Sequence, residues 1–258
     1  MNISCVDKMI KAYNLGYPHP SVLEDLVILD NAVEYEPDLI VWFVTLNTLI
    51  SQRINPFLVA NRDRVASVLD TYDVAFQQSS KLENQSAFHD KTLVGQRSNL
   101  ARRVKLEMLG MIWTATGEDT NRSAQSEITD FNVSDDTRYR GMEPPQNIKD
   151  MLLFSALAAG HDIAGPVPVL IVNEPIYLVP EERAAVRYNA VYPRWVYDQY
   201  RGHITSQAEI AQWNFLDLWN TVSPEYFADA YFHLSVEGER LLIQQINPAL
   251  QSIGCNLN

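Results

Sequence analysis

The chain has 258 residues, of which 47% are hydrophobic and 20% are charged, and this composition is typical of an ordinary globular protein. Its formal net charge of -12 argues against general nucleic-acid binding, which needs a basic face to displace counterions from phosphates. No apolar run near the N-terminus is long enough for a signal peptide or a membrane span, so the sequence as written predicts a soluble protein.

The first predicted elements are a strand and a helix. Residues 9–16, MIKAYNLG, favour a short strand that ends in a glycine turn. Ser21 and Glu24 then form an S-x-x-E capping box, in which each side chain satisfies a free backbone amide at the start of a helix. This helix is expected to end near Glu36, because Pro37 disfavours α geometry in the residue before it.

Strands and helices continue to alternate along the chain. Residues 38–47, DLIVWFVTLN, form a continuous apolar run, which is typical of a parallel strand covered on both faces by helices. The later predicted elements are a helix at 148–162, a buried strand at 167–175, a helix around 194–202, a short strand at 214–219 and a final helix from about Ser235. This alternation predicts an α/β fold built on a doubly wound parallel sheet.

Residues 76–150 interrupt this alternation, so we expect a single domain over residues 1–258 with an inserted, partly helical region at about 76–150. Within this region, residues 91–113 place basic side chains beside apolar ones, in the pattern of a basic amphipathic helix. Such a helix either lies on a membrane surface or packs on the domain with a solvated basic face, and the second interpretation is favoured. The sequence does not determine the oligomeric state.

In a doubly wound sheet, chemistry gathers beyond the carboxyl ends of the parallel strands. The residues that the predicted strands place at these ends are Gly16, Asn47, Asn173, Glu174, Asp229 and His233. Glu174 fits two interpretations equally, since its side chain can contact a substrate in the cleft or cap the turn before Pro175. Asp229 and His233 lie four positions apart, just before the final helix.

An aspartate and a histidine, such as Asp229 and His233, can together activate a nucleophile. In serine hydrolases an aspartate orients a histidine, and the histidine acts as general base toward a hydroxyl group. The pair alone is weak evidence, because an aspartate and a histidine often occur close together in proteins without this chemistry.

Three segments of the chain resemble sequence blocks of the SGNH (GDSL) hydrolases. The stretch DAYFHLSVEGERLL at 229–242 resembles the C-terminal block, in which an aspartate and a histidine on one loop precede a glycine and a helix. YNLG at 13–16 and VTLN at 44–47 resemble the second and third blocks. The resemblance implies that His233 is the catalytic base, that Asp229 is its partner, and that Gly16 N–H and the Asn47 side-chain amide form the oxyanion hole.

The same resemblance implies a three-layer, flavodoxin-like fold and a reaction at ester bonds, as in an esterase, a lipase or an O-acyl transferase. The substrate would be an ester of a small molecule, a polysaccharide or a lipid. The segments PDLIVWFVTLN, PVLIVNEP and YPRWVYDQYR further resemble a bacterial subgroup whose members are often membrane-anchored or extracytoplasmic.

The block that carries the nucleophile in this family, a GDS motif after the first strand, does not occur in the sequence, and neither does G-x-S-x-G. Ser4 lies before the predicted strand that ends at Gly16, and Ser21 is explained as a helix cap. We therefore expect an N-terminally shortened hydrolase that lacks its first strand and its nucleophilic serine. The alternatives are a non-catalytic SGNH-fold protein with a binding or structural role, or an inactive gene fragment.

No metal and no cofactor are predicted. Neither G-x-G-x-x-G nor a P-loop is present, which argues against a nucleotide cofactor. The other histidines and the two cysteines form no cluster at metal-ligand spacing. These residues are His19, His89, His161, His203, Cys5 and Cys255.

Aromatic side chains are frequent between residues 188 and 200. Their partly helical spacing favours packing in the core over a platform on which sugars stack. The residues are Tyr188, Tyr192, Trp195, Tyr197 and Tyr200.

Overall fold

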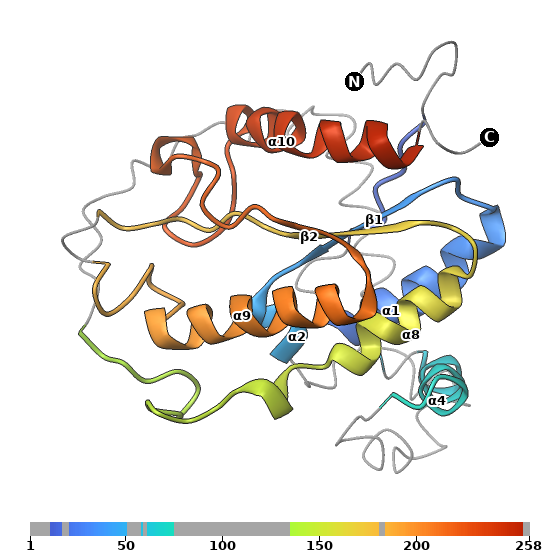
Figure 1. The fold of residues 1–258 in the computed structure, drawn as a ribbon, viewed down its shortest axis with the longest axis horizontal. Coiled ribbons are helices and arrows are strands. Elements are labelled where there is room, and N and C mark those ends of the chain that lie inside the picture. The colour runs from blue at the N-terminus through green and yellow to red at the C-terminus, as the bar shows by residue number, and fades with distance from the viewer. Residues whose placement is uncertain are drawn as a thin grey trace, which may run out of the picture.

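The computed structural model of the chain describes residues 11–16, 21–50, 58, 61–74, 135–180 and 184–254. Figure 1 shows the arrangement of their helices and strands. In chain order the elements are α1 (Val22–Ala32), the 3₁₀ helix η1 (Val33–Tyr35), β1 (Ile40–Val44), α2 (Leu46–Ile50), α4 (Arg62–Thr71), η3 (Lys149–Met151), α8 (Phe154–Ala164), β2 (Val169–Asn173), α9 (Arg194–Ala211), β3 (Asn214–Asp217), η4 (Pro224–Tyr226) and α10 (Val236–Gly254).

The three described strands form one parallel sheet in the order β1-β2-β3. Ile171 of the central strand lies opposite Trp42 on one side and Phe215 on the other. All five residues of β2 are buried, as expected for a strand with neighbours on both edges and helices on both faces. The predicted α/β class with a parallel sheet is therefore confirmed for this part of the chain.

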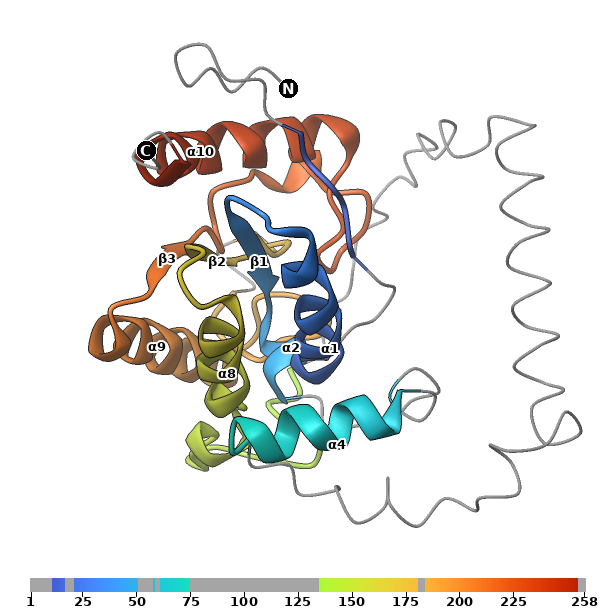
Figure 2. The same cartoon turned by 90° about the vertical axis from the view of Figure 1, so that its right-hand side faces the viewer.

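Side chains of β2 point alternately to two separate hydrophobic clusters. Val169 and Ile171 belong to the larger cluster, which also contains the buried faces of α1, α8 and α9. Leu170 and Val172 pack on the opposite face, where they meet Ile246 of α10. Figure 2 shows α10 on one side of the sheet and α1, α8 and α9 on the other. The continuous apolar run of this strand follows from this arrangement, because both of its faces are covered.

The N-terminal segment differs from its prediction. Residues 11–16 are exposed and contain no strand, so the prediction of a strand at 9–16 is wrong for them, and residues 9–10 lie outside the described part. The physical reason is the lack of a pairing partner, since none of the described strands forms a ladder with this segment. Figure 2 shows the segment on the side of β1 that faces away from β2.

Several other boundaries also differ from the prediction. The helix predicted at 148–162 begins only at Phe154, because Leu152 has extended backbone angles that end the preceding 3₁₀ turn. Helix α9 continues to Ala211, well beyond the predicted end, and α4 was not predicted at all. The predicted helix start is confirmed, since Ser21 is the N-cap of α1 and its backbone N–H donates to Glu24 Oε2, while the Ser21 hydroxyl has no hydrogen-bond partner among the described residues.

Most of the predicted insertion, residues 75–134, lies outside the described part of the chain, and with it the predicted amphipathic helix at 91–113. The end of the insertion is described and packs on α9. There, Trp195 Nε1 donates to Thr137 O and Gln199 Nε2 donates to Gln146 O. The chain therefore returns from the insertion along the N-terminal half of α9.

Helix α8 approaches β1 closely at a glycine. A Cβ atom added at Gly160 would lie only 2.1 Å from Cζ3 of Trp42. The Trp42 indole in turn donates its Nε1–H to Asp25 Oδ2 at 2.9 Å, so this contact joins α8, β1 and α1. Only a glycine leaves room for the indole ring at this crossing.

We expect Gly160→Ala to lower the free energy of unfolding by about 1–3 kcal/mol, because the indole must move and strain its neighbours. Gly202→Ala on α9 is the matched control, since a Cβ there meets nothing within 4 Å. That control should raise stability by about 0.5–1 kcal/mol, through helix propensity alone. Urea unfolding measures both, and equal stability changes in the two variants would contradict the close approach.

Candidate active site

The loop between β3 and α10 is closed by short-range backbone pairing. Phe227 and Leu234 form an isolated antiparallel bridge, and the backbone N–H of Ala228 donates to His233 O at 2.7 Å. At the end of the loop, Ser235 Oγ accepts from Gly238 N–H and donates to Tyr226 O, which caps the start of α10. The turn that contains Asp229 and His233 is thus held at both ends.

The Asp229 carboxylate organises the inside of this turn. Its Oδ1 accepts hydrogen bonds from three successive backbone N–H groups, those of Tyr231 at 2.9 Å, Phe232 at 3.2 Å and His233 at 3.2 Å. Its Oδ2 contacts Nδ1 of the His233 imidazole. One side chain therefore fixes both the backbone of the turn and the orientation of the ring.

This pairing leaves His233 Nε2 available. A neutral imidazole that donates from Nδ1 to a carboxylate carries its lone pair on Nε2, which is the arrangement a general base needs. The His233 side chain is 63% exposed, and within the described part of the chain no group forms a hydrogen bond with Nε2. The structure thus brings the side chains of Asp229 and His233 into contact, and the role of His233 as a base stays a prediction.

Asn47 lies in the first turn of α2, directly after β1, and not at the end of the strand predicted at 38–47. Its Oδ1 accepts the Tyr139 hydroxyl at 2.7 Å and Arg140 Nη2 at 3.2 Å. A guanidinium group can only donate, so the oxygen of the amide must face it. The Nδ2 group therefore faces elsewhere, and no hydrogen bond from it to another described residue is present.

Gly16 is the other predicted oxyanion donor. Its backbone N–H donates to the Asn14 side chain at 2.8 Å in the exposed N-terminal segment. No contact within the described residues connects it to His233 or to Asn47. Its part in an oxyanion hole stays a prediction.

Glu174 follows β2 and lies near His233. Its backbone N–H donates to Val44 O at 3.1 Å, which joins the carboxyl ends of β1 and β2. The pKa of the Glu174 carboxyl is raised to about 7, mainly by burial and also by the charge of Asp25, while the nearby His233 opposes this shift. The Glu174 side chain is thus an electrostatic neighbour of the proposed base.

Asp25 belongs to the same region, although the sequence did not suggest it. Burial raises the pKa of the Asp25 carboxyl to about 7, while the hydrogen bond from Trp42 opposes this shift. In the sequence, an acid near the start of a helix is explained by the helix dipole alone. Only the fold shows that Asp25 lies beside Glu174. Tyr139 and Arg140, which hold Asn47, also gave no sequence signal.

Asn173, at the end of β2, has a structural environment and not a catalytic one. It is fully buried, its Nδ2 donates to Asp217 Oδ1 at 2.7 Å, and its Oδ1 accepts the Tyr200 hydroxyl at 2.9 Å. Arg201 pairs with Asp217 at 2.6 Å and lies over the ring of Trp219. These hydrogen bonds join β2, β3 and α9 near the carboxyl ends of the two strands.

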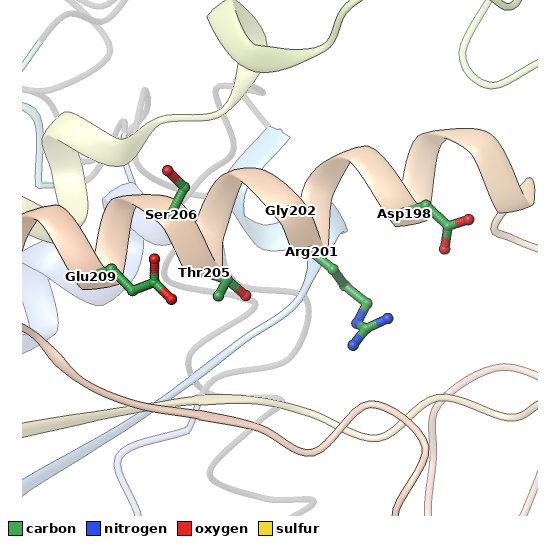
Figure 3. A pocket seen from close by; sticks show the side chains of 6 residues that line it. All are labelled: Asp198, Arg201, Gly202, Thr205, Ser206 and Glu209. Atoms are coloured by element: carbon green, nitrogen blue, oxygen red, sulfur yellow. The ribbon is translucent and has the colours of Figure 1, made fainter.

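A shallow surface depression on α9 is shown in Figure 3. All of its lining residues come from this one helix, and two of them already have partners elsewhere. Arg201 is paired with Asp217, and Asp198 accepts the Tyr188 hydroxyl at 2.6 Å. The depression lacks residues from a second element and does not include any of the predicted site residues.

Within the described ranges, no group of three or more histidine, cysteine, aspartate or glutamate side chains could hold a metal ion. None of the described helices is long and apolar enough to cross a membrane. Comparison of the chain with protein-family models, with curated protein sequences and with solved structures finds no significant match in any of the three.

The raised pKa of the partly buried Glu174 carboxyl predicts a pH-dependent stability. The pKa of Glu174 is raised from an ordinary value of 4.5 to about 7, so the folded protein keeps a proton that the unfolded chain has lost. Its contribution to the free energy of unfolding therefore falls as the pH rises from about 4.5 to about 7.

We expect Glu174→Gln to be more stable than the wild type at about pH 8 and equally stable at about pH 4, because glutamine resembles the protonated acid. Glu209→Gln on the exposed face of α9 is the control and should change stability little at either pH. Thermal unfolding across this pH range measures the effect. The same pH profile in the wild type and Glu174→Gln would show that Glu174 is not buried as described.

Proposed function

We propose that the protein is a serine hydrolase of SGNH type that acts on ester bonds, with His233 as its general base. The observation that carries this proposal is the Asp229–His233 pair, in which the carboxylate takes Nδ1 and leaves Nε2 exposed. The Asp229 carboxylate also holds three backbone amides of the same turn, so the ring is presented by a rigid loop.

In the proposed reaction, His233 Nε2 takes the proton of a serine hydroxyl while the serine oxygen attacks the ester carbonyl. Asp229 stabilises the imidazolium that forms, and the Asn47 Nδ2 amide donates to the oxyanion. The imidazolium then returns the proton to the leaving alcohol, and an acyl-enzyme remains. Water or an acceptor alcohol completes the cycle. Among the described residues, none donates a hydroxyl to His233 Nε2.

The arrangement of the sheet supports the SGNH fold within this proposal. The parallel order β1-β2-β3 fits the last three strands of the flavodoxin-like order 2-1-3-4-5. Within the described part, β1 has a neighbour only on its β2 edge, and residues 11–16 run along the side of the other edge (Figure 2). We propose that the complete sheet has a further strand at this edge and that this strand carries the serine.

The exposure of the proposed base bears on the substrate. The His233 side chain is 63% exposed, and such an open position suits an acyl group on a bulky substrate. We propose O-acyl groups of polysaccharides or lipids as the substrate class, in a protein that acts outside the cytoplasm. This substrate class rests on the family resemblance together with the open position of the base.

A non-catalytic binding or structural protein with the same fold is the second candidate. It is favoured by the Gly16 amide, which is bonded to Asn14, and by the lack of a hydroxyl partner for Nε2 among the described residues. Reaction of the protein, expressed from its complete gene, with a fluorophosphonate distinguishes the two. A labelled serine supports the hydrolase, and an unlabelled protein without esterase activity supports the second candidate.

We expect His233→Ala to abolish both fluorophosphonate labelling and most hydrolysis of a p-nitrophenyl ester, because no other base is placed to take the hydroxyl proton. Asp229→Asn should be less damaging, since the amide can still hold the turn through its oxygen. His203→Ala, in a partly exposed position on α9, is the control and should keep full activity. Full esterase activity in His233→Ala would show that His233 is not the general base.

We expect Asn47→Ala to lower kcat by a factor on the order of 10² to 10³, the usual cost of one oxyanion-hole donor. Tyr139→Phe should lower kcat less, because it removes one of the two groups that hold the Asn47 oxygen in place. KM should change little in both, as the donor acts mainly in the transition state. Steady-state kinetics measure these values, and a raised KM with unchanged kcat in Asn47→Ala would contradict the oxyanion role.

A further inference from the structure

A buried asparagine outside the predicted blocks contacts the loop of the proposed base. Asn189 lies in the chain segment between β2 and α9, and its side chain is fully buried. Its Nδ2 donates to Tyr177 O at 3.1 Å and to Tyr231 O at 3.2 Å. Its Oδ1 accepts the backbone N–H groups of Val191 and Tyr192, each at 2.9 Å. All of its hydrogen-bonding groups are therefore used, and three chain segments meet at one side chain.

Among the described residues, Tyr231 alone links Asn189 to the Asp229–His233 pair. The carbonyl of Tyr231 accepts from Asn189 and also from the Tyr177 N–H at 2.9 Å. The N–H of the same residue donates to Asp229 Oδ1 at 2.9 Å. The carbonyl side of Tyr231 is thus fixed to the body of the domain, while its amide side is fixed to the carboxylate that orients His233.

We infer that Asn189 is a positioning residue for the Asp229–His233 pair, which it holds in place through the backbone of Tyr231. This inference rests on the proposed function for its catalytic meaning, but the positioning itself does not require it. The geometry demands an amide side chain, because two donors face carbonyls and the acceptor faces two N–H groups. An aspartate keeps the acceptor alone, and an alanine keeps neither.

Loss of the two donors should loosen the turn without detaching it. Tyr231 O would keep its bond from Tyr177, so the loop stays on the domain. With the Tyr231 carbonyl held by one bond fewer, the turn would move more, the Asp229 carboxylate and the imidazole would be less closely aligned, and Nδ1 would no longer be the fixed site of the proton. The tautomer of His233 is therefore a readout that a general loss of stability does not change.

The test is ¹⁵N NMR of the imidazole nitrogens in protein expressed from its complete gene, at a pH where the ring is neutral. We expect the wild type to carry the proton on Nδ1, and Asn189→Ala and Asn189→Asp to show a mixture of tautomers. Asn214→Ala is the control, because Asn214 also donates to a carbonyl, that of Val169, but at the amino end of β3. Val196→Ala, a truncation in the core of α9, controls for lost stability.

Wild-type tautomer signals in both Asn189 variants would overturn the inference, as would the same mixture in the Val196→Ala control. If Asn189→Ala does not fold, Asn189→Asp still decides, since it keeps the bonds to Val191 and Tyr192. In an active protein, kcat of the Asn189 variants should fall roughly 10-fold to 100-fold with little change in KM. If the Asn189 variants show a mixture of His233 tautomers but the wild-type protein has no esterase activity, the positioning role stands and the proposed function is contradicted.

Discussion

The carboxylate of Asp229 is the constraint on which the proposed site depends. It lies among four donors, three backbone amides of its own turn and one imidazole nitrogen. The direction of the His233 ring is therefore set by the backbone of the turn and not by a free side-chain rotamer. Because the turn is also closed by the Phe227–Leu234 bridge, the exposed Nε2 has a defined position above the domain.

Hydrogen bonds at the carboxyl ends of the strands join the three strands of the described sheet. The bond from Glu174 N–H to Val44 O joins the ends of two strands, and Asn173 with Asp217 joins the second strand to the third. Above this level, the side chains of Asp25 and Glu174 form a partly buried acidic environment beside His233. Near the ends of β1 and β2, the proposed base His233 thus lies close to Glu174, whose carboxyl pKa is raised to about 7, and Asn47 follows β1 directly.

The sequence predicted those features whose signal is local. The apolar runs at 38–47 and 167–175 predicted two strands, and the Ser21–Glu24 pair predicted a helix start. The predicted core packing is confirmed for Tyr188, Tyr192, Tyr197 and Tyr200, while Trp195 is only partly buried against that core. Contacts between distant segments gave no such signal. Tyr139 meets Asn47 across 92 positions and Asn189 meets Tyr231 across 42, so neither pairing follows from spacing. The strand predicted at 9–16 failed for a related reason, because a strand depends on a neighbour that local sequence does not specify.

The most direct test of the account is a crystal structure of the protein, expressed from its complete gene, after reaction with a fluorophosphonate. The account predicts a phosphonylated serine whose Oγ lies about 3 Å from His233 Nε2. The phosphonyl oxygen should accept a hydrogen bond from Asn47 Nδ2. An adduct remote from both residues, or a protein that stays unmodified, would contradict the account.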